Sequence, residues 1–462
     1  MSFHETTMGA DEFILRGTRV VLPDGLRPAG VHVRDSRIHA IHSPETTPSA
    51  IRIEEASNAV VMPGVVDTHV HINQPGRTAW EGFETATRAA VAGGITTLIE
   101  MPLNSIPATT TVEAFHEKVR EAEGTCVVDT GFWGGVVPGN AGELQGLYEA
   151  GVFGFKCFLI DSGVPEFRAV TERDLREALP VLAKLGAVLL AHSELPGPIE
   201  KARAGVAGRG LSPTQHSTWL TTRPREAEHE AIGLLIRLCR EFRVRTHIVH
   251  LASADALPIL RAAREEGLPL TVETCPHYLT FATEQIPDGA TEYKCAPPLR
   301  EAENRERLWA GLADGTMDLI ASDHSPSPPE LKRRDGNFLL AWGGIASLQI
   351  SLAAAWTEAS RRGHSIEQLA RWMCRGPARL AGLAGRKGSL EPGYDADIVV
   401  WEPEAEFVVE PDTLHHRHKL TPYAGRRLRG VVAATYLRGE KVFDRRSGLA
   451  GARGKILRRG PL

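Results

Sequence analysis

The chain has 462 residues, of which 42% are hydrophobic and 24% charged, so it can bury a large core and still form a smaller domain beside it. Its net charge of −4 gives no general electrostatic reason to bind nucleic acid or a membrane surface. No apolar run approaches the roughly 18 residues that a membrane-spanning helix needs. Composition and charge therefore argue against a membrane protein and against a nucleic-acid-binding protein.

The cysteines and the amino terminus indicate the compartment. The six cysteines are scattered without a C-x-x-C pair, which in so long a chain is typical of reduced thiols in a cytosolic protein. The first residues, M-S-F-H-E-T-T-M-G-A-D-E, lack the basic and apolar regions of a signal peptide. We therefore expect a cytoplasmic protein.

Both ends of the chain have the pattern of short strands. From Phe13 to about Met62, apolar β-branched stretches such as R-V-V-L-P-D-G alternate with turn residues, and no amphipathic stretch of helix length appears. The same pattern returns after about Lys387, in D-I-V-V-W and V-V-A-A-T-Y-L. We predict that residues 1–62 and 386–462 pair into one small β-sandwich domain, with residues 63–385 forming a separate domain.

The middle of the chain alternates strands with helices. The predicted strands are Val65–His71, Thr96–Met101, Cys126–Phe132, Phe153–Leu159, Ala187–His192, Thr246–Leu251, Leu268–Thr274 and Met317–Asp323. The predicted helices include Glu113–Glu123, Glu172–Leu185, Arg225–Phe242, Ala254–Glu266, Asn304–Ala313 and Gly343–Ser360. An open doubly wound sheet is the alternative, but no Gly-rich phosphate loop follows the first strand. The sequence therefore predicts an α/β fold, a (β/α)8 TIM-type barrel with a small β-sandwich from both chain ends.

The first strand of this barrel carries two histidines. In G-V-V-D-T-H-V-H, His69 and His71 are two residues apart, so on a strand their side chains point to the same face. Imidazole is the commonest protein ligand for transition metals. A pair of surface histidines is the simpler interpretation, but other candidate ligands end strands in the same way.

Four further residues stand where predicted strands end. Lys156 lies in G-F-K-C-F, His192 ends A-V-L-L-A-H, His250 ends T-H-I-V-H, and Asp323 ends D-L-I-A-S-D. Barrel enzymes assemble their sites from the carboxyl ends of the strands. Four histidines, a carboxylate and a lysine meeting there favour a site for two divalent metals.

Each candidate also has a structural alternative. The structural alternative for His192 and His250 is a role as hydrogen-bonded core histidines. The alternative for Asp323 is a role as the N-cap of a helix. Lys156 is costly to bury as an ammonium, although its stem can extend to the barrel mouth and leave the amine in water. A lowered pKa would instead make the Lys156 amine a nucleophile that adds CO₂ to give a carbamate, a carboxylate able to bridge two metals.

The remaining histidines receive other assignments. His247 precedes His250 by three residues and faces the opposite way on its strand, so we expect a structural role. His277, in C-P-H-Y-L just beyond the seventh strand, is left open between a direct ligand and a supporting residue. Solvent-facing or capping roles are expected for His216, His229, His324, His364, His415, His416 and His418.

Together these residues resemble the amidohydrolase superfamily, in which an H-x-H strand end, a carboxylated lysine, two later histidines and an aspartate hold two metals. Within it the chain is most similar to the allantoinase family. The segments that carry this resemblance are H-V-H-I-N-Q-P-G-R-T-A-W-E-G-F, M-P-L-N-S-I-P-A-T-T, F-K-C-F-L-I-D-S-G-V, E-T-C-P-H-Y-L, S-D-H-S-P-S-P-P-E-L-K and H-K-L-T-P-Y-A-G. The segment G-S-L-E-P-G-Y-D-A-D-I-V-V-W resembles the superfamily's carboxyl-terminal sandwich.

The resemblance implies a chemistry. His69 and His71 would hold one metal with Asp323, His192 and His250 the other, and N6-carboxylated Lys156 would bridge both. Zinc is the first choice, with cobalt, manganese or iron as alternatives. A hydroxide between the metals would open the hydantoin ring of allantoin to allantoate.

The resemblance also implies roles around the metals. Asp323 would act first as general base and then as general acid. The expected substrate contacts are Asn73, Asp161, Ser162 and the backbone near Cys295. The family further implies a homotetramer that acts on a small molecule.

Three relatives compete with this assignment. Dihydroorotases usually carry Arg where this chain has Asn73, and hydantoinases or dihydropyrimidinases usually carry Tyr where it has Asp161. The dihydropyrimidinase-like scaffold proteins keep the fold without the metal site, whereas this chain retains all six metal-site residues. The enzyme interpretation is therefore preferred.

Overall fold

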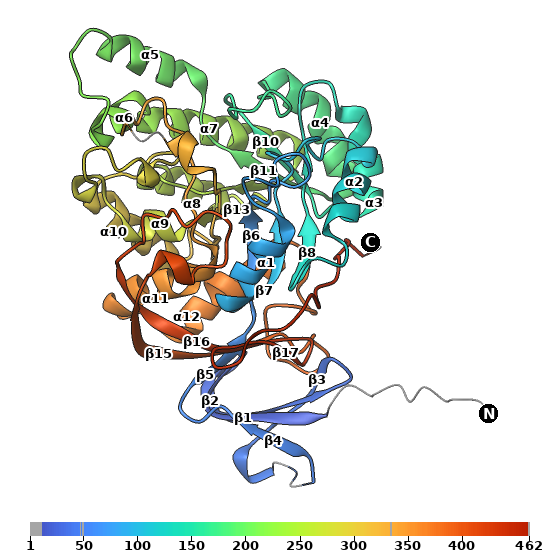
Figure 1. Ribbon diagram of the computed structural model, residues 1–462. Helices are drawn as coiled ribbons and strands as arrows, with labels where there is room; N and C mark the ends of the chain where they lie inside the picture. Colours follow the sequence, from blue (N-terminus) through green and yellow to red (C-terminus); the bar gives the residue numbers. More distant parts are fainter. Residues whose placement is uncertain (1–11, 47, 49, 333–334, 461–462) are drawn as a thin grey trace.

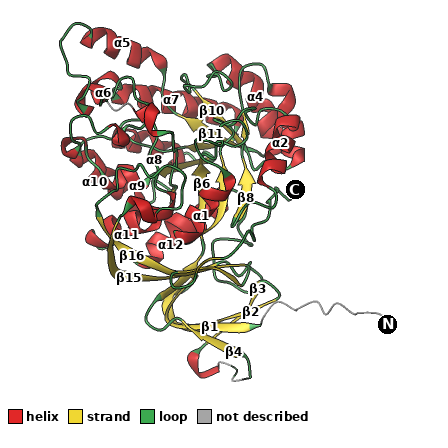
Figure 2. Cartoon of the chain, viewed as in Figure 1, coloured by secondary structure: helices red, strands yellow, loops and turns green. Residues whose placement is uncertain are grey.

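The computed structural model describes residues 12–46, 48, 50–332 and 335–460. Residues 1–11, on which the expected absence of a signal peptide rests, lie outside the described residues. Figure 1 shows a helix-rich region above and a strand-rich region below, and Figure 2 marks the same division by secondary structure. Both strand-rich ends of the chain, blue and red in Figure 1, meet in the lower region.

The lower region is built around one sheet drawn from both chain ends. Its strands are β1 (Phe13–Leu22), β2 (Gly25–Arg34), β3 (Arg37–His42), β4 (Arg52–Glu55), β5 (Val60–Pro63), β15 (Ile398–Val408), β16 (Arg427–Leu437), β17 (Glu440–Asp444) and β18 (Gly448–Leu449). The two ends join where β5 pairs antiparallel with β15, Val61 opposite Val400. Apolar residues from both ends, including Val31, Val61 and Ile398, pack into one cluster. The predicted β-sandwich from both chain ends is confirmed.

The upper region is a parallel barrel. Its strands are β6 (Val65–Val70), β7 (Ile95–Glu100), β8 (Asp129–Phe132), β9 (Gly134–Gly135), β10 (Phe155–Phe158), β11 (Val188–His192), β12 (Arg245–Ile248), β13 (Leu270–Thr274) and β14 (Leu319–Ile320). Neighbouring strands pair in parallel from β6 to β8 and from β9 to β14. A parallel bridge between Val70 and His324 joins the two edges. The predicted TIM-type barrel is confirmed.

Helices surround this barrel. They are α1 (Phe83–Ala92), α2 (Val112–Ala122), α3 (Leu144–Ala150), α4 (Glu172–Leu185), α5 (Pro196–Val206), α6 (His216–Thr222), α7 (Arg225–Phe242), α8 (Leu257–Glu265), α9 (Pro276–Thr280), α10 (Ala302–Ala313), α11 (Ser351–Arg361), α12 (Ile366–Ala370) and α13 (Gly376–Leu380). A π-helical turn, η8, covers Arg371–Arg375. Short 3₁₀ turns are η1 (Pro44–Thr46), η2 (Ala141–Glu143), η3 (Ala254–Ala256), η4 (Thr283–Gln285), η5 (Thr291–Tyr293), η6 (Pro329–Lys332), η7 (Leu348–Ile350) and η9 (Pro411–Thr413).

Local sequence signals set several helix boundaries. α4 begins after Thr171, whose side chain accepts a hydrogen bond from the Asp174 N–H in a capping box, and it ends at Gly186 in the left-handed conformation. α4 and α7 have the predicted bounds. The predicted helix Gly343–Ser360 is wrong at its start, because Gly344 has φ of 128° and packs against the backbone of Ser325, so α11 begins only at Ser351.

The predicted strands extend beyond the observed ones at both ends. β14 covers only Leu319–Ile320 of the predicted Met317–Asp323. His250 and Asp323 have φ of 40° and 45°, a left-handed conformation that is uncommon for residues with a side chain. A strand ladder cannot continue through such residues, so the pairing ends before them and the side chains turn at the barrel mouth.

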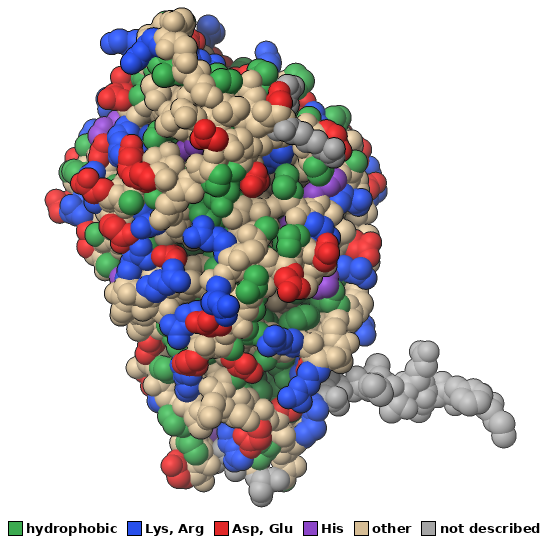
Figure 3. Space-filling view, turned by 60° about the vertical axis from the view of Figure 1, so that its left-hand side comes forward, with side chains coloured by type: hydrophobic (Ala, Val, Ile, Leu, Met, Phe, Trp, Pro, Cys, Tyr) green, Lys and Arg blue, Asp and Glu red, His purple; other side chains and the backbone are tan. Residues whose placement is uncertain are grey.

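The surface and the thiols agree with the composition. All six cysteines lie among the described residues, buried and free of disulfides. Figure 3 shows basic and acidic side chains interspersed over one face of the molecule. Within the described part of the chain, no helix combines the length and the hydropathy that crossing a membrane requires.

Candidate metal centre

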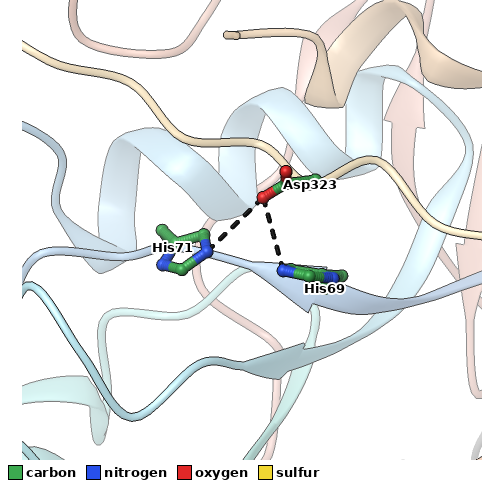
Figure 4. A group of neighbouring side chains, drawn as sticks. All are labelled: His69, His71 and Asp323. Carbon is green, nitrogen blue, oxygen red and sulfur yellow. Dashed lines mark ion pairs between the residues drawn. The ribbon is translucent and has the colours of Figure 1, made fainter. Parts of the chain in front are cut away.

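His69, His71 and Asp323 meet at the carboxyl ends of two neighbouring barrel strands (Figure 4). His69 lies in β6 and His71 directly after it, while Asp323 follows β14. Asp323 Oδ1 lies 3.3 Å from His69 Nε2 and 3.4 Å from His71 Nε2. All three side chains are buried and offer one ligand atom each within metal-binding range of the others. The spacing of two along the strand therefore brings the two imidazoles to one carboxylate, as the sequence predicts.

A buried glutamate orients His69. Glu273, in β13, accepts a hydrogen bond from His69 Nδ1, lies 3.0 Å from His247 Nε2 and accepts from the backbone N–H of His250. Burial alone would raise the pKa of Glu273, but the charges of and hydrogen bonds from His69 and His247 hold that pKa well below its usual range. With Nδ1 held by this carboxylate, His69 turns its other ring nitrogen, Nε2, toward the centre.

The second pair of histidines faces the same space. His192 Nδ1 lies 3.1 Å from His250 Nε2, while the other nitrogen of His192 contacts Glu194 at 2.8 Å. Glu194 is in turn paired with Arg223. Burial first, and then the positive charge of Lys156, hold the pKa values of both histidines well below the ordinary value, which keeps their ring nitrogens neutral. His192 Nδ1 and His250 Nε2 therefore lie close enough together to serve as two ligand atoms of one metal ion.

Lys156 is a buried amine with no hydrogen-bond partner among the residues that the structure describes. Its side chain on β10 is fully buried, and no described residue hydrogen-bonds to its Nζ. Burial lowers the pKa of Lys156 to about 8, although the charges of Glu273 and Asp323 act in the opposite direction. The stem does not carry the amine out to water. The alternative of a lysine that reaches solvent therefore does not hold.

Asp323 is fixed by its neighbours. Ser325 Oγ donates to Asp323 Oδ1 at 2.8 Å, and no helix begins at the residues that follow Asp323 in the described chain, so the N-cap alternative does not hold. Asp67 accepts hydrogen bonds from the backbone N–H groups of His69 and Ser322 at 3.1 Å each and so ties β6 to the end of β14. The charges of His69 and the hydrogen bond from His71 outweigh burial and hold the pKa of Asp323 well below its usual range.

The structure separates the remaining histidines. His277 groups with Cys275 and Asp323 as a second set of potential ligands, and neither of its ring nitrogens has a partner among the described residues. The prediction of solvent-facing roles is wrong for His216, His324 and His416, which are all buried. His324 stays inside because it bridges Val70 and accepts from the backbone N–H of Ser347 at 3.1 Å, which is a capping contact. Of the seven histidines expected to face solvent or cap helices, His229, His364, His415 and His418 are half-buried.

A cavity of about 290 Å³ opens above the centre. Its walls include the hydrophobic side chains of Leu103, Phe158 and Trp342 and the cationic ones of Arg203, Arg223 and Lys294. The cavity is large enough for a small ring. Its hydrophobic side chains exclude bulk water from one side of such a ring.

The predicted substrate contacts Asn73, Asp161, Ser162 and Cys295 all line this cavity. Asn73 offers a buried side-chain N–H₂ without a partner among the described residues. The Ser162 hydroxyl already donates to the carbonyl oxygen of Phe167 at 2.6 Å, and the Cys295 carbonyl accepts from Trp219 Nε1 at 3.1 Å. The Asp161 carboxylate accepts one hydrogen bond, from the backbone N–H of Gly163 at 3.1 Å, which leaves its second oxygen for a ligand.

The sequence analysis missed several supporting residues. Glu273 stands at the end of the predicted seventh strand, the same signal that identifies the ligands. Asp67 and Glu194 lie two residues from His69 and His192, but nothing in the sequence distinguishes them from other buried carboxylates.

The chain matches the family model described as the amidohydrolase family over residues 60–442. The allantoinase of Streptomyces avermitilis is 50% identical over 434 residues, covering 94% of this chain and 95% of that protein. The allantoinase of Arabidopsis thaliana is 43% identical, covering 94% and 88%. Among solved structures, an L-hydantoinase (dihydropyrimidinase) from Arthrobacter aurescens superimposes with a TM-score of 0.92 at 32% identity, covering 97% of this chain and 100% of that one. The chain belongs to the amidohydrolase family and, within it, to the allantoinases.

Proposed function

We propose that this chain hydrolyses the hydantoin ring of allantoin to give allantoate. The observation that carries the reaction class is the meeting of four imidazoles, a carboxylate and a buried amine at the mouth of one barrel, the amine having no partner in the described part of the chain. The choice of allantoin rests on relatives named allantoinase, which are 40–50% identical over most of the chain.

The donor set fits two divalent metals. His69 Nε2, His71 Nε2 and Asp323 would hold one ion, and His192 Nδ1 and His250 Nε2 the other. The orphaned Lys156 Nζ fits a carbamate, since a neutral amine adds to CO₂ by forming an N–C bond and releasing one proton. Neutral imidazole and carboxylate suit zinc, cobalt, manganese and iron, of which zinc is our first choice.

When bound, the metals supply Lewis acidity and lower the pKa of water from 15.7 to about 7. Asp323 is ionised and faces the centre, so it can take the proton of the attacking water and then give it to the departing ring nitrogen. Overall, the water oxygen bonds to the ring carbonyl carbon, the ring C–N bond breaks, and the products are a carboxylate and an N–H. The hydrogen bond from Ser325 holds the Asp323 carboxylate in place for both transfers.

The substrate is an uncharged ring, so hydrogen bonds rather than ion pairs should orient it. We assign this role to Asn73 and Asp161 through their side chains, and to Ser162 and Cys295 through their backbone groups. The hydrophobic walls Leu103, Phe158 and Trp342 exclude water from the rest of the cavity.

A panel of allantoin, hydantoin, dihydrouracil and dihydroorotate tests this assignment with the purified, metal-loaded enzyme. We expect the highest kcat/KM for allantoin. The second candidate is a hydantoinase or dihydropyrimidinase, which the superposition on the Arthrobacter aurescens structure favours. Turnover of dihydrouracil with allantoin inert would establish that candidate instead, and dihydroorotate as the best substrate would establish the dihydroorotase alternative.

The metal and the assembly need separate measurements. Elemental analysis of enzyme purified without chelators should find about two metal ions per chain, as a two-metal hydrolase requires. Light scattering coupled to size exclusion tests the homotetramer. The cytoplasmic location also stays a prediction, since one relative is named as the mitochondrial allantoinase of Aquarana catesbeiana.

A further inference from the structure

A second cavity, of about 560 Å³, lies at the opposite end of the barrel. It opens at the amino-terminal starts of β11 to β14, where Val188, Arg245, Leu270 and Leu319 contribute to its wall. The helical segment from Arg371 to Leu380, which comprises η8 and α13, forms another side. It shares no described lining residue with the cavity above the metal centre. This cavity is therefore a separate place on the fold.

Four arginines line it. Arg245 comes from the start of β12, and Arg371, Arg375 and Arg379 come from the helical segment. Side chains four residues apart on a helix lie on one face, so this spacing presents three guanidinium groups in a row. All four arginines are exposed.

Within the part of the chain that the structure describes, the charges of these arginines are not neutralised. No carboxylate of the described residues forms an ion pair with any of the four arginines, and Arg245 donates to the carbonyl oxygen of Leu380 at 3.1 Å. Asp318, the acidic residue of the described lining, is already bonded to Arg264 at 2.6 Å and to the backbone N–H of Val272 at 2.9 Å. The cavity therefore holds several uncompensated positive charges.

Most of the other lining side chains are apolar, with Thr271 and Asp318 as the polar exceptions. The apolar side chains include Leu268, Pro269, Leu312, Met317 and Trp372. A volume of about 560 Å³ lies within the range of small-molecule sites and exceeds what an inorganic phosphate fills. The π-helical turn at Arg371–Arg375 is a second feature that is common at functional sites. Guanidinium groups bind phosphate in a bidentate manner, and an apolar wall accepts a flat ring.

We propose that this cavity binds an organic polyphosphate of the nucleoside di- or triphosphate class. The arginines contact the phosphates and the apolar wall contacts the base. The assignment uses none of the residues of the metal centre, so it stands or falls independently of the ring-opening reaction.

The test is calorimetric titration of the full-length, metal-loaded enzyme with ATP. The ATP is saturated with magnesium, so that it does not remove the metals of the centre. We compare the wild type with Arg375→Gln/Arg379→Gln and with a control of equal charge loss, Arg120→Gln/Arg173→Gln, whose exposed arginines lie on α2 and α4. Tripolyphosphate and adenosine serve as probes of the two halves of the ligand.

We expect wild-type binding of ATP in the range of about 10–100 μM, which the cavity variant weakens by at least about tenfold and the control leaves unchanged. Tripolyphosphate should bind more weakly than ATP, and adenosine weakest. Unchanged melting temperature and allantoin turnover in both variants establish that the cavity variant is folded.

Three results would overturn the proposal. They are no heat of binding for any probe up to about 1 mM, equal weakening in both variants, and full binding by the cavity variant. Equal weakening would show that only the general charge of the surface matters.

Discussion

Two buried lysines show how differently this molecule treats the same charge. Lys387 lies at the junction of barrel and sandwich, where its Nζ contacts Asp129 at 2.7 Å, Asp395 at 3.0 Å and Asp397 at 2.6 Å. Burial opposes the charge of Lys387, but the three carboxylates outweigh it and raise the pKa above its ordinary value. Lys156 lies at the barrel mouth, equally buried, with no hydrogen-bond partner among the described residues and a pKa lowered to about 8.

The difference separates a structural site from a chemical one. Asp129 belongs to β8 of the barrel and Asp397 immediately precedes β15 of the sandwich, so Lys387 holds the two regions together as a satisfied ion pair. At the barrel mouth the fold leaves Lys156 unsatisfied among groups that are themselves good metal ligands. Burying an amine without a hydrogen-bond partner destabilises the folded state. Chemical modification of the amine in the working enzyme would remove this destabilisation.

The largest effect is expected from Lys156→Ala, which should lose bound metal and reduce turnover by at least about 10⁴-fold, since the bridging group and the metals are lost together. Acetate or propionate with added metal should restore part of the activity, because the missing part is a bridging carboxylate. The measurement is metal content and rate before and after adding the acid.

Lys156→Gln is the matched control, because its amide fills the space without the charge and should not respond to carboxylates. Normal metal content and normal rate in Lys156→Ala would remove the bridging role and make this lysine structural, like Lys387.

Asp323→Asn should lower kcat by about 10²–10⁴-fold while retaining more metal than Lys156→Ala. The amide can still occupy the ligand position but cannot shuttle a proton. Steady-state kinetics beside elemental analysis check this. A near-normal kcat at full metal occupancy would remove Asp323 from acid–base chemistry.

Lys387→Met should reduce the free energy of unfolding by about 3–5 kcal/mol, since it leaves the buried carboxylate of Asp397 without its cation, while Asp129 keeps its ion pair with Arg438. Denaturant titration measures the loss, with m-values confirming an unchanged cooperative unit. The specific activity of the molecules that remain folded should equal that of the wild type. Loss of activity without loss of stability in Lys387→Met would contradict the assignment of Lys387 as the structural lysine and Lys156 as the chemical one.

Glu273→Gln should weaken metal binding by about 10–100-fold, the usual effect of removing a carboxylate that orients a metal-binding histidine. The glutamine amide no longer accepts strongly from His69 Nδ1, so the lone pair at Nε2 is less well fixed. Competition with a chromogenic chelator gives the affinity. Unchanged metal affinity would show that packing alone orients His69.

The smallest effect is expected from pH acting on Lys387. Its folded pKa is raised above the unfolded value of 10.5, so its stabilisation is fully present below 10.5 and is lost as pH rises through the folded pKa. The difference in unfolding free energy between the wild type and Lys387→Met should therefore stay constant from about pH 7 to about pH 9. A steady rise of that difference with pH over this range would mean that the folded pKa of Lys387 lies below its unfolded value.

Periodic sequence patterns predicted the architecture and the ligands because both depend on local periodicity. A spacing of two on a strand places His69 beside His71, and strand ends locate His192, His250 and Asp323 at one face of the barrel. Helix α4 was predictable residue for residue, since Thr171 and Gly186 are local start and stop signals.

What could not be predicted depends on contacts between distant segments. Glu273 matters because it meets His69, which is 204 residues away, and no periodicity encodes that pairing. His416 and His324 are buried because the carboxyl-terminal segment packs against the barrel, their rings 5.4 Å apart. The left-handed backbone at Asp323 likewise shortened β14 in a way that strand-forming residues do not reveal.

The most direct test of the central claim is carbon-13 NMR of the enzyme reloaded with zinc in ¹³C-labelled bicarbonate. The account predicts a carbamate resonance in the wild type that disappears in Lys156→Ala and upon chelation of the metal. A fully active, metal-loaded wild-type enzyme without a carbamate resonance would contradict it.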